Sequence, residues 1–82
     1  MTNTDHLLRN RFVSVAYLPA KRPMIFVHSL MSDECAEVFC GSDGAGAWEQ
    51  LRKIFRADDG FDSVIRFIDN RDLRIIRYKL AA

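Results

Sequence analysis

The sequence has few of the residues that cross-link or interrupt a fold. Its 82 residues include only two cysteines, two prolines and four glycines, and no apolar run approaches the roughly 18 residues that cross a bilayer. Two cysteines cannot form the disulfide framework of a small secreted domain, and the polar segment 1–10 lacks the pattern of a signal peptide. We therefore expect a cytoplasmic protein with reduced thiols and no membrane partner.

The sequence also lacks a net charge that would indicate a class of partner. Twelve Lys and Arg residues nearly balance eleven Asp and Glu residues, so the net charge is +1 and gives no reason to expect general binding to polyanions. The charges are nevertheless segregated, because no Lys or Arg occurs from Pro23 to Leu51, whereas arginines crowd the C-terminal part. We expect the acidic middle and the basic end to complement each other within the fold or between subunits; the alternative is a charged docking surface.

The length and composition are those of one small ordered domain. A chain this short buries only somewhat more than about 60% of its unfolded surface, and 49% of its residues are hydrophobic, which excludes the disordered class. We expect a flexible lead-in over residues 1–10 and a single domain over residues 11–82. Some apolar groups are expected at an oligomer or partner interface, because so small a body cannot hide them all.

The clearest helical period lies in the segment 44–55, which contains the only tryptophan. Its apolar residues recur at the three- and four-residue spacing of one helix face. They are Ala45, Trp48, Leu51, Ile54 and Phe55. We expect this face to anchor the core, with Ser42 or Asp43 accepting from the free N–H groups at the start of the helix.

Alternating apolar residues, many of them β-branched or aromatic, predict strands on both sides of that helix. The segments concerned are 11–18, 24–30, 35–40 and 73–79. In the first of them, Val13, Val15 and Tyr17 are expected to face the core. The nearly unbroken apolar run at 24–30 indicates a central strand that is covered on both faces.

The segment 61–70 allows two structures. In the first, the segment is a helix, because its apolar residues have helical spacing; they are Phe61, Val64, Ile65 and Ile68. Asp62 is then a candidate N-cap, and Gly60 is a candidate positive-φ residue that ends the preceding helix. In the second, segments 63–68 and 73–78 form a hairpin. The helix is favoured. The order β-β-β-α-α-β then predicts an α+β two-layer domain, with an antiparallel sheet of about four strands and the helices packed on one face.

Candidate chemical sites are weak. Cys35, Cys40 and His28 could supply zinc ligands or a cysteine nucleophile with its base, but the two cysteines are not spaced as in a zinc knuckle and no oxyanion donor is evident. The glycine-rich segment 41–46 lacks the Lys-Ser/Thr of a phosphate loop, and Asp43 would repel an anion. We therefore expect no metal, no cofactor and no enzymatic activity.

Two groups of charged residues remain as candidate surfaces. One is an acidic protein-interaction surface; its residues are Asp33, Glu34, Glu37 and Asp43. The other is a basic surface for nucleic-acid contact; its residues are Arg71, Arg74, Arg77 and Lys79. On a strand, Arg71 and Arg77 would share one side and Arg74 would lie on the other, which divides the basic surface.

These observations favour a small cytoplasmic protein-interaction module, an adaptor or inhibitor, that acts through a charged surface and self-associates, for example as a homodimer. A nucleic-acid-binding module that uses the basic C-terminal strand is the alternative. A small cysteine-dependent enzyme is the third hypothesis.

Overall fold

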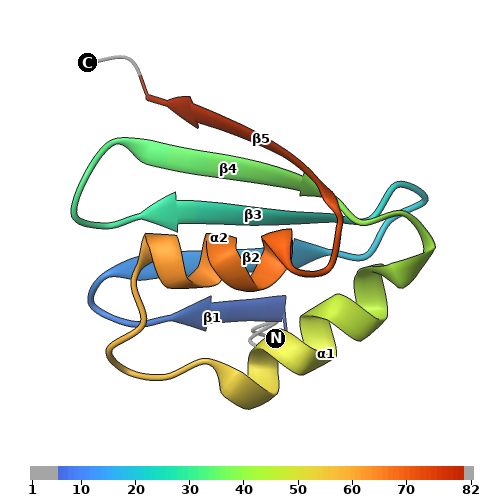
Figure 1. Cartoon of the computed structure of the whole chain (residues 1–82), viewed down its shortest axis with the longest axis horizontal. Coiled ribbons are helices and arrows are strands. Elements are labelled where there is room, and N and C mark those ends of the chain that lie inside the picture. Colours follow the sequence, from blue (N-terminus) through green and yellow to red (C-terminus); the bar gives the residue numbers. More distant parts are fainter. Residues whose placement is uncertain (1–5, 81–82) are drawn as a thin grey trace, which may run out of the picture.

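The computed structural model describes residues 6–80, which form one five-stranded sheet and two α-helices (Figure 1). The strands are β1 (Leu7–Arg9), β2 (Val13–Leu18), β3 (Met24–Ser29), β4 (Glu34–Phe39) and β5 (Arg74–Lys79). A short 3-10 turn, η2 (Gly41–Asp43), leads into α1 (Gly44–Ile54), and α2 (Phe61–Asp69) precedes β5. The predicted α+β class is confirmed, with five strands in place of about four.

The strands lie in the sheet in chain order, and each is antiparallel to its neighbours. β3 is therefore central, as its apolar run predicts, and β5 adds at the edge next to β4. Neither helix within residues 6–80 is long and apolar enough to span a bilayer.

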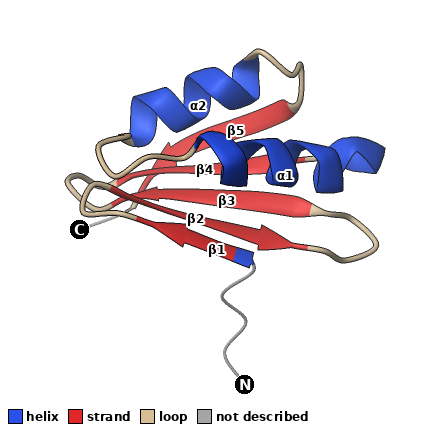
Figure 2. Cartoon of the chain, turned by 90° about the horizontal axis from the view of Figure 1, so that it is seen from below, coloured by secondary structure: helices blue, strands red, loops and turns tan. Residues whose placement is uncertain are grey.

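One side of the sheet faces both helices (Figure 2). Val15, Val27 and Ala36 lie opposite one another on β2, β3 and β4 and are all buried, as alternation along antiparallel strands requires. They belong to one core cluster that also contains residues of α1 and α2. Val13 and Val15 are inside, in agreement with the sequence pattern.

Helix α1 approaches the sheet closely at its first turn. A Cβ atom on Gly44 would lie 2.9 Å from the Cβ atoms of both Cys40 and Pro23, so only glycine allows this approach. Trp48 is only 2% exposed, as predicted, but Ala47 is buried where the sequence pattern selects Ala45. The buried face is thus turned slightly from the expected one. Neither Ser42 nor Asp43 makes a side-chain cap.

The segment 61–69 is helical, so the helix is correct and the hairpin is wrong. Phe61, Val64, Ile65 and Ile68 are its buried residues, at the predicted spacing. The N-cap is Gly60 rather than Asp62, and no side chain caps the helix. Gly60 has φ −107°, so the expected positive φ is also wrong; within residues 6–80, positive φ occurs at Gly41 and Asp72.

The expected lead-in contains the short strand β1, and Asn10 fixes the turn that follows it. The Asn10 side-chain oxygen accepts from the backbone N–H groups of Phe12 and Val13. Its amide nitrogen donates to the backbone carbonyls of Arg56 and Asp59, at 2.9 and 2.7 Å. One side chain therefore joins the β1–β2 turn to the segment between α1 and α2.

Candidate interaction surface on the sheet

The side of the sheet turned away from the helices is not covered by any element within residues 6–80 (Figure 2). Residues opposite each other on antiparallel strands point to the same side, so the pairing defines this open face as three rows. Read from β1 to β5, the first row is Arg9, Ser14, His28, Cys35 and Tyr78, and the middle row is Leu7, Ala16, Phe26, Glu37 and Ile76. The third row has no β1 member and consists of Leu18, Met24, Phe39 and Arg74.

The open face is largely apolar and accessible. Leu18, Leu7 and Ile76 are 49%, 46% and 42% exposed, and Phe26 and Phe39 are half-buried. The expectation that β3 is covered on both faces is therefore wrong for this chain alone. The run at 24–30 is apolar on both sides, yet the two short helices supply only one covering layer.

Charges of both signs lie on the open face. Glu37 is in the middle row, next to Ile76 on β5, and Arg74 lies with its guanidinium 5.3 Å from the centre of the Phe39 ring. Arg9 is at the opposite edge, on β1. The pKa of Tyr78 is raised by desolvation and by its hydrogen bond to the Glu37 carboxylate. The face thus combines an apolar centre with one acid and basic edges.

The two cysteines lie on opposite sides of the sheet and are both free and buried. Cys35 is opposite His28 on the open face, whereas Cys40 belongs to the helix-side core. Burial and nearby carboxylates raise the pKa of the Cys35 thiol, and a hydrogen bond from Tyr78 lowers it by less. Burial also raises the pKa of the Cys40 thiol. Raised pKa values keep both sulfurs as thiols at neutral pH, which is the opposite of an activated nucleophile. No group of metal-ligating residues occurs in the described part of the chain.

The four acidic candidates do not form one surface. Asp33 and Glu34 lie at the start of β4, and Glu37 is on the open face. Asp43 follows the other end of β4, and its carboxylate accepts from the Arg71 guanidinium at 2.9 Å.

The four basic candidates are also separated. Arg71 pairs with Asp43, and Arg77 lies on the helix side, 3.9 Å from Asp62 and over the Phe61 ring. Arg74 is on the open face, and Lys79 lies opposite Glu34. Alternation along β5 places Arg74 on one side of the sheet and Arg77 on the other, as the sequence predicts. Arg71 and Arg77 also have acidic partners.

Known proteins do not indicate which of these surfaces functions. Comparisons with protein-family models, with curated proteins and with solved structures find no match to this chain. The open face is the most extended candidate surface, and the charge pattern of the sequence does not reveal it. A usable signal was present, since the strands are apolar on both sides while the two predicted helices can cover only one.

Proposed function

We propose that this chain is a cytoplasmic protein-interaction module that works as a homodimer, with the open face of the sheet as its interface. The observation that carries the proposal is the apolar surface on the side of the sheet that no helix within residues 6–80 covers. Its residues are exposed on β1, β2 and β5 and half-buried on β3 and β4. Contiguous apolar surface of this kind marks interaction sites in proteins that otherwise bury such groups.

The size of the open face suits a second copy. The four strands of six residues rise about 20 Å each, and β1, with three residues, rises about 10 Å. At a strand spacing of about 4.8 Å the face covers about 430 Å² in projection. Packing two such rough faces together removes about 1,000–1,400 Å² of accessible surface in total, near the lower limit of stable interfaces. Two sheets packed about 10 Å apart form an ordinary sandwich core.

The charges on the open face are also self-complementary. A two-fold axis parallel to β3 places β4 of one subunit over β2 of the other, and β5 over β1. Glu37 of one subunit then lies over Ala16 of the other. Strand β2 carries no charge on the open face, and Arg9 lies on the adjacent strand β1. This arrangement keeps the two Glu37 carboxylates apart and brings acid near base across the interface.

In this dimer both helix layers lie on the outside. Exposed charged residues of the helices, such as the ion-paired Glu49 and Arg52 and Asp62 beside Arg77, then remain accessible to a further protein. We propose an adaptor or inhibitor role for these outer surfaces.

Two matched substitutions test the dimer. Ile76 on the open face and Ile54 on α1 are 42% and 44% exposed, so Ile76→Glu and Ile54→Glu make the same change at equal exposure on opposite sides. Size-exclusion chromatography with light scattering should give about twice the monomer mass of 9.5 kDa for the wild type and for Ile54→Glu. It should give the monomer mass for Ile76→Glu. A monomeric wild type at about 100 µM, or the same mass for both variants, would refute the proposal.

A further inference from the structure

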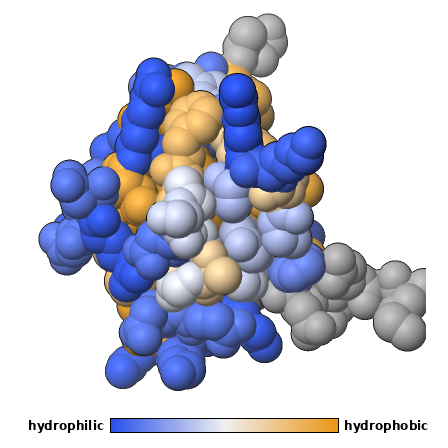
Figure 3. Space-filling view, turned by 90° about the vertical axis from the view of Figure 1, so that its right-hand side faces the viewer, coloured by the Kyte–Doolittle hydropathy of each residue, from blue (hydrophilic) through white to orange (hydrophobic). Residues whose placement is uncertain are grey.

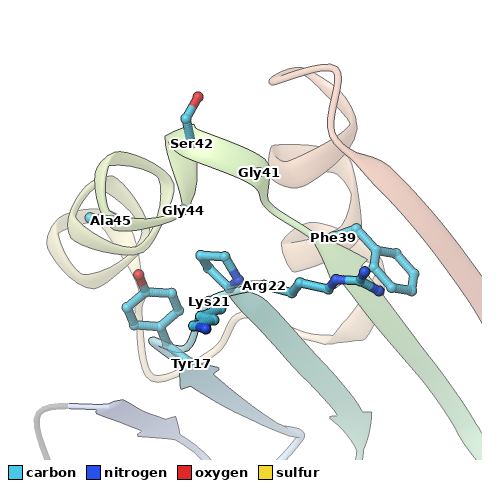
Figure 4. Close-up of a pocket in the computed structure, with 9 residues that line it drawn as sticks. Tyr17, Lys21, Arg22, Phe39, Gly41, Ser42, Gly44 and Ala45 are labelled. Carbon is cyan, nitrogen blue, oxygen red and sulfur yellow. The ribbon is translucent and has the colours of Figure 1, made fainter.

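A cavity lies at one end of the sheet, between the β2–β3 loop and the first turn of α1. Its volume is about 650 Å³, within the usual range for small-molecule sites. Tyr17, Pro23 and Phe39 supply apolar walls, and Lys21 and Arg22 come from the loop (Figure 4). Figure 3 looks onto this end of the molecule and shows apolar surface exposed between hydrophilic side chains.

Within residues 6–80 the basic residues of this cavity have no ion-pair partner. Neither Lys21 nor Arg22 takes part in an ion pair within residues 6–80, and no carboxylate lines the cavity. Asp43, which would repel an anion in the glycine-rich segment, is instead held by Arg71 at 2.9 Å. The structure thus removes two objections to anion binding at this segment: the acid is neutralised, and a distant loop supplies the missing cations.

The shape and chemistry of the cavity walls indicate which class of ligand the cavity binds. The Tyr17 ring lies beneath the start of α1, and the Arg22 side chain extends toward Phe39 (Figure 4). A guanidinium and an ammonium suit a phosphate group, and aromatic walls suit a flat ring. We propose that this cavity binds an aromatic phosphate of the size of a nucleoside monophosphate. The cavity shares Phe39 with the open face, but Lys21, Arg22 and Pro23 lie outside that face, so the cations of the site are not part of the proposed dimer interface.

An NMR titration at low salt tests the site with three probes: AMP, adenosine and inorganic phosphate. AMP carries both the ring and the phosphate, and each of the other two carries one part. AMP should shift the backbone amide signals of residues 17–22 and 39–45 in a saturable way. Adenosine and phosphate should each bind at least about tenfold more weakly, because each makes only part of the contacts.

Two double variants distinguish binding of AMP in the cavity from a general attraction of AMP to positive charge on the protein. Lys21→Ala/Arg22→Ala should raise the Kd for AMP at least about tenfold. Lys53→Ala/Arg56→Ala removes the same charge at the other end of α1, where both residues are exposed, and should leave the Kd unchanged. Amide spectra show whether each variant remains folded.

Three results would overturn the proposal. They are the absence of saturable shifts with AMP, an equal loss of binding in both double variants, and shifts confined to the open face. Each can occur whether or not the protein dimerises, so the outcome does not depend on the proposed function.

Discussion

The Tyr17 ring stacks on the Trp48 indole, with ring centroids 5.5 Å apart and planes inclined by 22°. This contact joins Tyr17, on the helix side of β2, to the buried Trp48 of α1. Because an offset stack of two large rings adds to the energy of burial, the pair is a main attachment of α1 to the sheet.

We expect Trp48→Ala to lower the free energy of unfolding by about 3–5 kcal/mol, since it removes a buried ring and leaves a cavity. That loss approaches the whole stability of a small domain, which is about 5 kcal/mol or somewhat more. Trp48→Phe keeps a ring in the core and should lose much less. Urea unfolding followed by circular dichroism measures both; a loss below about 1 kcal/mol for Trp48→Ala would contradict a central position of the indole.

Asn10 provides a second test of the fold, because its side chain makes two hydrogen bonds within its own turn and two to the distant segment 56–59. Asn10→Ala should lower the free energy of unfolding by about 1–3 kcal/mol, since partly buried backbone groups lose their partners. Asn10→Asp keeps the two acceptor contacts but places a carboxylate against the carbonyls of Arg56 and Asp59.

The Asn10→Asp deficit should therefore shrink at acid pH, where a protonated carboxyl can again donate to one of the carbonyls. Urea unfolding of the wild type and both variants at neutral and acid pH measures this. A pH-independent deficit for Asn10→Asp would contradict the donor role of the Asn10 amide.

Much of the fold follows from local sequence patterns. The period of two in 11–18 predicts that Val13 and Val15 face the core, and the period of 3.6 in 61–70 predicts the buried residues of α2, because both patterns depend only on neighbouring residues. Strand β1 was missed since three residues are too few to show a period. The change from Ala45 to Ala47 on α1 depends on the angle at which the helix meets the sheet, which no local pattern encodes.

The site was harder to predict than the fold. Alternation along the last strand correctly separates Arg74 from Arg77, but the pairing of Arg71 with Asp43 joins residues 28 positions apart. The apolar run at 24–30 predicts a strand that is covered on both faces. That expectation fails for one chain and is the basis of the proposed dimer, in which a second sheet supplies the missing layer.

Stability should fall at alkaline pH. Burial raises the pKa of the Cys35 and Cys40 thiols above 9.0, and desolvation raises the pKa of the Tyr78 phenol above 10.0. Above about pH 9 the unfolded chain loses these protons first, so the folded chain binds more protons and its stability decreases as pH rises.

Below about pH 8 these groups should contribute little pH dependence, because the thiols are almost fully protonated in both states. Urea unfolding under reducing conditions, from neutral pH to about pH 10.5, measures the trend. Cys35→Ser and Cys40→Ser should each flatten it. An unfolding free energy that rises with pH over this range would contradict the raised pKa values.

Nucleic-acid binding should be weak. Arg71 and Arg77 have acidic partners, and Glu37 lies in the middle row of the face that holds Arg74. The fluorescence anisotropy of a labelled single-stranded oligonucleotide should therefore rise little when the protein is added at low salt. Strong binding that weakens with salt at a slope near −0.7 per phosphate contact, and that Arg74→Ala reduces, would instead support the nucleic-acid alternative.

The central claim is that the open faces of two copies meet. Isotope-filtered NOE spectroscopy on a mixture of labelled and unlabelled chains reports only contacts between subunits. We expect such contacts between the two copies of Phe26, between Leu18 and Phe39, and between Ile76 and Leu7. We expect none to Val64 or Ile68 of α2, whose side chains face the core. Intermolecular contacts that involve the helices but not the open face, or no intermolecular contacts at concentrations near 1 mM, would contradict the account.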